Sequence, residues 1–287
     1  MNNPIDISEH PEVKTLISLA LQEDGAQWDI TTLSLVNPDI EIKATVLARH
    51  PCRVAGGDVA RAVFLQLDAS LKIEQLISDG SDAKADDILL LIKGKASPIL
   101  SGERTALNFM QRMTGIATLT QSFVMAVSDT KCKILDTRKT ASGMRVLDKY
   151  SVKCGGGTNH RLGLCDMVLI KDNHRRLWKN GNPDNLGQAI VEARKKFPDT
   201  PIEVEVENLT ELQSALTANP EWIMLDNMPL EKMREAVILV NGRCKIEASG
   251  GITMGNVRNV AHTGVDAISL GCLTHSVTAA DLSLEIL

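Results

Sequence analysis

The chain has few aromatic residues and no long hydrophobic run, and each shortage excludes a class of protein. Aromatic residues make up 3% of its 287 residues, which leaves few platforms on which single-stranded nucleic acid could stack. The longest apolar runs, such as residues 88–92, are far shorter than the roughly 20 residues of a membrane helix. The first residues have neither the basic start nor the apolar stretch of a signal peptide. We therefore expect a cytoplasmic protein with neither a membrane nor a nucleic acid as its partner.

The six cysteines include no C-x-x-C pair, so the sequence indicates neither a zinc ribbon nor a redox motif. The net charge of −5 also argues against a polyanion as partner. Hydrophobic residues make up 44% of the chain and charged residues 23%, as in an ordinary globular protein. This length and composition predict about two domains, or one barrel with an appendage.

The charge is distributed unevenly along the chain. Between Lys131 and Lys179 there are twelve basic and four acidic residues, so this segment carries +8 and the rest of the chain −13. A basic segment in an acidic protein favours a concave site for a small, highly anionic ligand. For any single residue of the segment, an exposed helix face with salt bridges is an equally good interpretation.

The first hundred residues have the pattern of an α+β block with largely antiparallel strands. Apolar residues at three- and four-residue steps predict a helix over 8–23, and residues 28–32 predict a loop or a helix cap. A second helix is predicted over 58–67. The predicted strands are 41–49, 51–55, 71–77 and 87–95. A lipoyl-like hairpin is an alternative for residues 71–95, although no lysine lies at its tip in the usual D-K-A setting.

Residues 101–129 predict one or two helices, with Ser101 as the cap and a break at Gly115. Beyond residue 131, short apolar runs alternate with helical stretches. The predicted strands are 133–136, 167–170, 202–206, 222–225, 245–248 and 267–270. The predicted helices lie near 143–153, 184–196, 209–218, 229–240, 254–263 and 277–286. This alternation predicts a parallel sheet in an incomplete, about seven-stranded α/β barrel.

Polar residues or glycines follow each of the six predicted strands, where the functional groups of such barrels gather. The segments are Asp136–Thr140, Lys171–His174, Asp226–Asn227, Ser249–Gly251 and Gly271, while the strand at 202–206 carries Glu203, Glu205 and Glu207 on one face. Carboxylates on a strand face are costly unless they meet cations, a metal or hydroxyl groups. A metal site on this strand is an alternative, but no histidine has clear metal-ligand spacing.

These residue types describe a ligand that contains two carboxylates and a phosphorylated sugar. Arg138 and Arg161 can each grip a carboxylate with a planar guanidinium. Lys139 and Lys171 suit phosphate or pyrophosphate, and the glycine junctions offer backbone N–H groups for a phosphate. Glu205 and Asp226 can hold sugar hydroxyls or approach Mg²⁺ through water. His160 follows a glycine-rich loop, and a core histidine bonded to the backbone is its alternative interpretation.

Several motifs resemble those of the quinolinate phosphoribosyltransferase family, and the resemblance extends over nearly the whole chain. They are Gly102–Phe109, Leu135–Thr140, Lys153–Gly157, Asn159–Leu164 and Leu169–His174. The resemblance implies an N-terminal open sandwich over residues 1–114, a barrel over 115–275 and a tail, 276–287, that packs on the sandwich. It also implies a homodimer with a shared active site, or a larger oligomer such as a hexamer. The implied reaction forms nicotinate mononucleotide, CO₂ and pyrophosphate from quinolinate and phosphoribosyl pyrophosphate, in NAD biosynthesis.

The resemblance also assigns roles to residues. Quinolinate is expected at Arg138, His160, Arg161 and Lys171, with Arg104 reaching in from the partner subunit. Phosphoribosyl pyrophosphate is expected at Lys139, Lys171, Glu205, Asp226, Ser249, Gly250, Gly251, Gly271 and His275. Lys139, Lys171, Glu205 and Asp226 are the expected catalytic residues, and the cofactor Mg²⁺ is expected near Glu205 and Asp226 without direct protein ligands.

Two other functions stay open from the sequence. A class I aldolase would use Lys171 to form a Schiff base at a strand end. A non-catalytic relative would keep the pocket only to bind an anion. One departure from the family pattern is the segment 175–181, which is more charged than expected and leaves the shape of this loop open.

Overall fold

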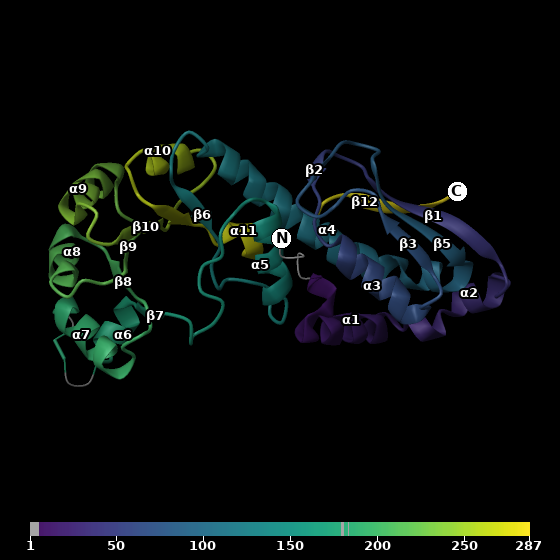
Figure 1. The fold of residues 1–287 in the computed structure, drawn as a ribbon, viewed down its shortest axis with the longest axis horizontal. Helices are drawn as coiled ribbons and strands as arrows, with labels where there is room; N and C mark the ends of the chain where they lie inside the picture. Colours follow the sequence, from purple (N-terminus) through teal and green to yellow (C-terminus); the bar gives the residue numbers. More distant parts are fainter. Residues whose placement is uncertain (1–5, 179–180, 183) are drawn as a thin grey trace. The chain divides into compact units, whose positions relative to one another are not determined.

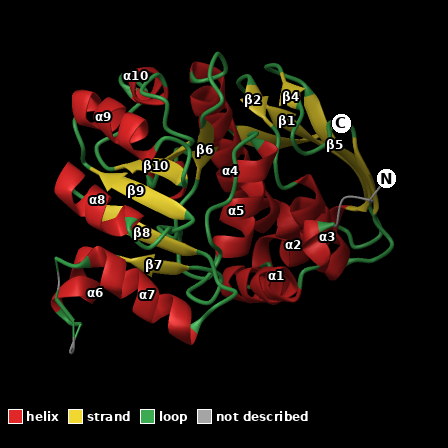
Figure 2. Ribbon diagram, turned by 60° about the vertical axis from the view of Figure 1, so that its left-hand side comes forward, coloured by secondary structure: helices red, strands yellow, loops and turns green. Residues whose placement is uncertain are grey.

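The structure is a computed structural model that describes residues 6–178, 181–182 and 184–287. It divides into two compact units (Figures 1 and 2). Unit 1 contains Met1–Gln121, Thr140–Gly156 and Cys272–Leu287, and unit 2 contains Ser122–Lys139 and Gly157–Gly271. In the described part of the chain, no helix is both long and apolar enough to cross a membrane.

Unit 1 combines a four-stranded antiparallel sheet with helices. Its sheet has the order β12-β1-β5-β3, and β2 pairs with β4. The strands are β1 (Glu41–Ala48), β2 (Cys52–Arg53), β3 (Lys72–Gln75), β4 (Asp82–Ala83), β5 (Ile88–Lys95) and β12 (Leu282–Ile286). The helices are η1 (Ile7–Glu9), α1 (Pro11–Asp24), η2 (Ala26–Trp28), α2 (Ile30–Leu35), α3 (Gly57–Leu67), α5 (Arg145–Cys154), α11 (Cys272–His275) and most of α4 (Ala96–Ala126).

The core of unit 1 follows from the apolar periodicity of its elements. Helix α1 buries Val13, Ile17 and Leu21, which lie three or four residues apart and share one face. Asp29 caps α2 by accepting hydrogen bonds from the amides of Thr31 and Thr32, at 3.1 and 3.0 Å. The cap predicted at residues 28–32 is thus confirmed, with a short helix directly after it.

Helix α4 is continuous, so the predicted start at Ser101 and the predicted break at Gly115 are wrong. Ser101 lies inside the helix, and its hydroxyl donates to Asp29 Oδ2 at 3.1 Å. Gly115 is required by packing: a Cβ at this position would lie 2.3 Å from the carbonyl oxygen of Thr278. Glycine therefore serves here to let another segment of backbone approach closely.

The last segment of the chain is a strand, so the helix predicted over 277–286 is wrong. Strand β12 pairs antiparallel with β1, from Ala44 opposite Ile286 to Ala48 opposite Leu282. Leu282, Leu284 and Ile286 alternate with polar residues, which is the two-residue period of a strand. Pairing with β1, which lies more than 230 residues earlier in the chain, explains why this segment forms a strand and not the predicted helix.

Unit 2 contains the parallel sheet that the alternating pattern predicts. Its strands have the order β6-β11-β10-β9-β8-β7. They are β6 (Lys133–Leu135), β7 (Val168–Ile170), β8 (Ile202–Val206), β9 (Trp222–Asp226), β10 (Lys245–Ser249) and β11 (Ala267–Ser269). Between them lie α6 (Asp172–Arg176), α7 (Leu186–Lys196), α8 (Leu209–Leu216), α9 (Leu230–Val240) and α10 (Val257–Ala261). Helices α7, α8 and α9 lie along the outside of the sheet (Figure 2).

The sheet of unit 2 is open, which confirms an incomplete barrel. The described residues form six strands rather than about seven. Beside the edge strand β6, Thr158 makes a single parallel bridge with Leu135 and takes the place of a further strand. The amide of Thr158 donates to the carbonyl oxygen of Ile134 at 2.8 Å. This bridge brings the loop after Gly157 to the carboxyl end of β6.

Candidate functional site

A cavity of about 190 Å³ lies within unit 2, where the carboxyl ends of its strands meet. Four of the lining residues follow β6 or β7 and carry a positive charge or a hydroxyl group, and two others belong to the loop at 158–161. The lining residues are Thr137, Arg138, Lys139, His160, Arg161, Leu169, Lys171, Met224, Glu247, Ser249 and Ser269. Six of the predicted site residues therefore line one cavity.

Two arginines give this cavity its preference for an anion. Arg138 Nε is buried and has no hydrogen-bond partner among the residues described. Arg161 donates from Nη1 to the carbonyl oxygen of Met167 at 3.0 Å. Burial, and then the charge of Arg138, lower the pKa of Arg161. Two guanidinium groups that repel each other, one of them unsatisfied, are stabilised when a carboxylate-bearing ligand lies between them.

Asp136 holds the loop that carries Arg161. This carboxylate, directly after β6, is fully buried. It accepts hydrogen bonds from the backbone amide of His160 at 2.9 Å and from the side chain of Asn159 at 2.5 Å. The sequence places Asp136 at a strand end, and the structure shows that it organises the loop instead of facing a ligand.

His160 lies against two buried glutamates. Its Nε2 is 3.1 Å from Oε2 of Glu203 on β8 and 3.3 Å from Oε2 of Glu247 on β10. Burial by itself lowers the pKa of His160, but the interactions with both glutamates outweigh it and raise the pKa to about 9. Burial, and then the charge of Glu247, raise the pKa of Glu203 to about 7. Glu203 therefore tends to keep its proton near neutral pH, while the amide proton that Nδ1 of His160 accepts from Arg161 opposes a second proton on the ring.

These three residues are also the one group in the described chain whose ligand atoms are close enough to hold a metal ion, all within 4.8 Å of one another. The sequence shows no histidine near the acidic strand, because His160 reaches it from a loop more than 40 residues earlier. However, His160 Nδ1 accepts a hydrogen bond from the amide of Arg161 at 2.7 Å. A ring with a lone pair at Nδ1 carries its proton on Nε2, which then cannot bind a metal. The geometry favours a hydrogen-bonded cluster.

Lys171 and Glu205 form an ion pair at the end of β7 and β8, with Nζ 2.5 Å from Oε2. The amide of Lys171 donates to Nδ1 of His174 at 3.0 Å, so His174 caps the start of α6. Glu207 lies beyond the end of β8 and is exposed, so it does not share the site. Asp226 ends β9 opposite Ser249 of β10, which places these two predicted residues side by side.

The turn after β10 requires its glycines. Gly250 has φ +90° and Gly251 has φ +62°, both in the left-handed region. A Cβ on Gly250 would also lie 2.3 Å from the side chain of Asn227. The turn does not lead directly into a helix as predicted, because residues 252–256 precede α10. Gly271 directly precedes the short helix α11, whereas the sequence predicted the next helix only from residue 277.

Two predicted site residues belong to unit 1, so their part in the site stays a prediction. Arg104 is exposed on α4, and His275 is exposed at the end of α11. The segment after Lys171 is partly defined: Arg175 pairs with Glu211 at 2.9 Å, whereas Lys179 and Asn180 lie outside the described residues. For Arg175, the interpretation as a salt-bridged residue is thus confirmed.

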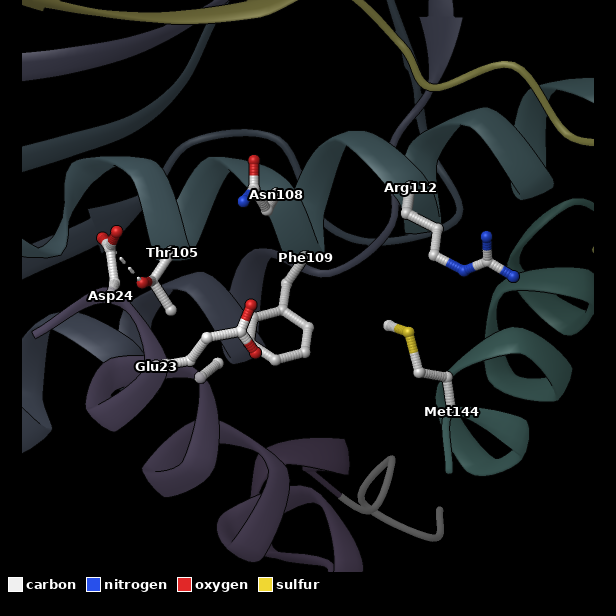
Figure 3. Close-up of a pocket in the computed structure, with 8 residues that line it drawn as sticks. Glu23, Asp24, Thr105, Asn108, Phe109, Arg112 and Met144 are labelled. Atoms are coloured by element: carbon white, nitrogen blue, oxygen red, sulfur yellow. Dashed lines mark hydrogen bonds between the residues drawn. The ribbon is translucent and has the colours of Figure 1, made fainter. Parts of the chain in front are cut away.

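A cavity of about 300 Å³ in unit 1 is larger, but its charges do not suit an anion (Figure 3). Glu23 and Asp24 lie at one end, and Thr105 donates to Asp24 at 3.4 Å. Arg112 lies at the other end, where its guanidinium is held by the buried Asp148 at 2.9 and 2.8 Å. Acids are therefore available to a ligand here, while the arginine is already neutralised.

Two residues of the cavity, one on β10 and one on β11, were not predicted as site residues. Glu247 and Ser269 line it, and the hydroxyl of Ser269 is buried without a hydrogen-bond partner in the described structure. Glu247 follows Ile246 and precedes Ala248 in a buried strand. An acid in such a run is the same indication that singled out Glu203, and it could have identified Glu247.

The fold and the cavity together define a class: an open parallel α/β barrel with a cavity lined by arginines and lysines at the carboxyl ends of its strands. Sequence models described as the N-terminal and C-terminal domains of quinolinate phosphoribosyl transferase match residues 29–114 and 116–285. The chain belongs to the quinolinate phosphoribosyltransferase family.

Individual relatives are similar over almost the whole chain. The chloroplastic carboxylating nicotinate-nucleotide pyrophosphorylase of Oryza sativa is 42% identical, over 99% of this chain and 80% of the relative. The carboxylating nicotinate-nucleotide pyrophosphorylase of Mycobacterium leprae is 38% identical, over 97% and 98%. The solved structure of the nicotinate-nucleotide pyrophosphorylase from Francisella tularensis has 40% identity and a TM-score of 0.92, over 99% of this chain and all of that one.

Proposed function

We propose that this protein transfers the phosphoribosyl group of phosphoribosyl pyrophosphate to quinolinate. The products are nicotinate mononucleotide, CO₂ and pyrophosphate, which places the reaction in NAD biosynthesis. The observation that carries this proposal is the pair Arg138 and Arg161 in one cavity, with Arg138 Nε buried and unpartnered in the described structure. The names of close relatives support it, since they are carboxylating nicotinate-nucleotide pyrophosphorylases.

In this proposal, residues of the cavity and further predicted site residues outside its lining divide between the two substrates. Arg138 and Arg161 bind the carboxylates of quinolinate, with His160 and Lys171 beside them. Glu205 and Asp226 bind the ribose hydroxyls, and Lys139 and Lys171 bind the pyrophosphate. The 5′-phosphate lies at Ser249, Gly250, Gly251 and Gly271, with His275. Arg104 of a second subunit completes the quinolinate site.

The residues promote the reaction mainly by holding charge where it develops. When the bond to pyrophosphate breaks, positive charge builds on the ribose ring, and the carboxylates of Glu205 and Asp226 stabilise it. The lysines stabilise the departing anion. The arginines hold the pyridine nitrogen at C1′, where it attacks. When the 2-carboxylate then leaves as CO₂, the electron pair stays on C2, where the adjacent pyridinium nitrogen stabilises it until a proton from water binds C2 and completes nicotinate mononucleotide.

Mg²⁺ is part of this proposal as a cofactor. The carboxylate oxygens of Glu205 and Asp226 suit this hard cation, which keeps several of its waters when it binds proteins. These two residues would hold it through water, so that it neutralises charge on the pyrophosphate. Removal of Mg²⁺ with EDTA is expected to abolish turnover, and its return to restore it.

The assay that tests the function compares quinolinate with nicotinate, each with phosphoribosyl pyrophosphate and Mg²⁺. We expect CO₂ and pyrophosphate in equal amounts from quinolinate and no turnover of nicotinate. The absence of both products would reject the enzyme and favour an anion-binding relative. Borohydride trapping of a carbonyl substrate on Lys171 would instead support an aldolase. The Lys171–Glu205 ion pair argues against it, because it occupies the nitrogen that a Schiff base needs.

We also propose a homodimer, alone or within a hexamer, with an active site shared between subunits. A variant that lacks Arg104 and a variant that lacks Arg138 are each expected to be inactive. Mixing them with confirmed subunit exchange is expected to restore part of the activity, because some hybrid sites contain both arginines. No restoration under these conditions would argue against a shared site.

A further inference from the structure

Two glutamates that the proposed reaction does not use are buried in the sheet of unit 2, and one of them, Glu247, lines the cavity. Glu203 is 0% exposed and Glu247 is 1% exposed. Met224 of β9 lies opposite Glu247 of β10 on one side and opposite Glu205 of β8 on the other. Strand β9 therefore lies between β8, which carries Glu203, and β10, which carries Glu247. Neither carboxylate oxygen of Glu203 meets the criteria of a hydrogen bond with a described residue, and Oε1 of Glu247 has no hydrogen-bond partner among them either. Buried carboxylates with so few partners destabilise a fold, so their presence here requires a compensating role.

Both glutamates are directed at the same atom. Nε2 of His160 lies 3.1 Å from Oε2 of Glu203 and 3.3 Å from Oε2 of Glu247. The side chain of His160 is only 8% exposed, so water does not compete strongly for this contact. The imidazole is thereby held between strands β8 and β10.

The other end of the imidazole holds the loop of Arg161. Nδ1 accepts the amide of Arg161 at 2.7 Å, and the amide of His160 itself donates to Asp136 at 2.9 Å. A continuous set of polar contacts thus leads from Glu203 and Glu247 through the ring to the peptide of Arg161. This peptide sets the direction in which the Arg161 guanidinium enters the cavity.

We propose that Glu203 and Glu247 are positioning residues, which orient Arg161 for quinolinate through His160. The inference rests on the proposed function, because quinolinate is the ligand that Arg161 holds. What the glutamates supply is an acceptor for the Nε2 proton at a fixed place, so an uncharged acceptor of the same shape serves equally well. A metal ion has no part in the cluster, since Nε2 carries a proton.

The test uses the full-length protein and two double variants. Glu203→Met with Glu247→Met removes both acceptors at similar volume, and Glu203→Gln with Glu247→Gln keeps an oxygen at each position. In the methionine variant we expect kcat/KM for quinolinate to fall about 10²-fold, as for a misplaced binding group, with KM for phosphoribosyl pyrophosphate unchanged. We expect the glutamine variant to recover most of the loss. Glu207→Met, on an exposed residue just beyond β8, is the matched control and keeps wild-type kinetics.

Melting temperature and direct quinolinate binding separate this role from a structural one. Removal of two buried charges offsets the loss of the acceptors of His160 Nε2, so the melting temperature should change little, whereas a purely structural role predicts a marked decrease. Calorimetric titration with quinolinate alone should show weaker binding in the methionine variant. If that variant fails to fold, the single Met and Gln variants give the same comparison.

Three results would overturn the inference. The first is wild-type quinolinate kinetics in a folded methionine variant, and the second is a glutamine variant as impaired as the methionine variant. The third is one equivalent of Zn²⁺ or Mn²⁺ bound by the wild type and lost in the methionine variant. A wild type that neither releases CO₂ nor binds quinolinate rejects the proposed function, and the inference with it.

Discussion

Replacement of Arg138 by glutamine tests the central geometric claim, that two guanidinium groups bind the carboxylates of quinolinate. A hydrogen bond to a charged group is worth about 1.5–3 kcal/mol, and a guanidinium makes two of them to one carboxylate. The loss is therefore about 3–6 kcal/mol, or about 10²- to 10⁴-fold in kcat/KM at 1.4 kcal/mol per factor of ten. The fold should not suffer, because Arg138 Nε has no partner to lose in the described structure and Arg161 loses a repulsive neighbour.

The assay is CO₂ release at varied quinolinate and saturating phosphoribosyl pyrophosphate, together with the free energy of unfolding in urea. Arg194→Gln is the matched control, because Arg194 pairs with Glu221 at 2.9 Å on the surface of the same unit. It should lose about 0–1 kcal/mol of stability and no activity. A loss of less than about tenfold in the Arg138 variant would show that this guanidinium does not bind a carboxylate of quinolinate, since a single charged hydrogen bond is already worth that much.

Two further predictions concern the stability of unit 1. Gly115→Ala should lower the free energy of unfolding by about 1–3 kcal/mol, because the added Cβ must displace the carbonyl of Thr278. Gly163→Ala is the control and should change the free energy of unfolding little, because the space around its Cβ is open. Equal melting temperatures for both variants would contradict this packing. Hydrogen bonds, chiefly from the side chain of Thr32, lower the pKa of Asp29, so its contribution is complete above its ordinary pKa of about 4 and is lost as the pH falls further. The difference in melting temperature between wild type and Asp29→Asn should therefore shrink between about pH 6 and pH 3, and a difference that stays constant would exclude a role for the charge.

The strands of unit 2 could be predicted because the information is local. Each strand is a run of three to five mostly apolar residues, and polar residues or glycines mark its end. All six predicted runs form strands. The errors in unit 1 have a non-local cause. Gly115 looks like a helix break until the approach of Thr278 is known, and the pattern of residues 282–286 has an evident partner only when β1 is in place.

The same distinction applies to the site. Arg138, Lys171 and Ser249 follow parallel strands, whose carboxyl ends meet at one edge of a sheet, so they line one cavity as expected. The contact of His160 with Glu203 and Glu247 could not be predicted, because it depends on how the loop of residues 158–161 folds back over the sheet. The sequence indicates that acids on a buried strand destabilise the fold, but it does not show which group offsets this loss of stability.

The pairing of β12 with β1 has a consequence for synthesis of the chain. While the protein emerges from the ribosome, β1 can pair with β5 early, but its other edge has no neighbour until residues 282–286 are translated. An uncovered strand edge is a template for association with other chains. The N-terminal sheet is thus the first to begin folding and the last to be finished, so nascent chains that stall near the end expose this edge to chaperones or to one another.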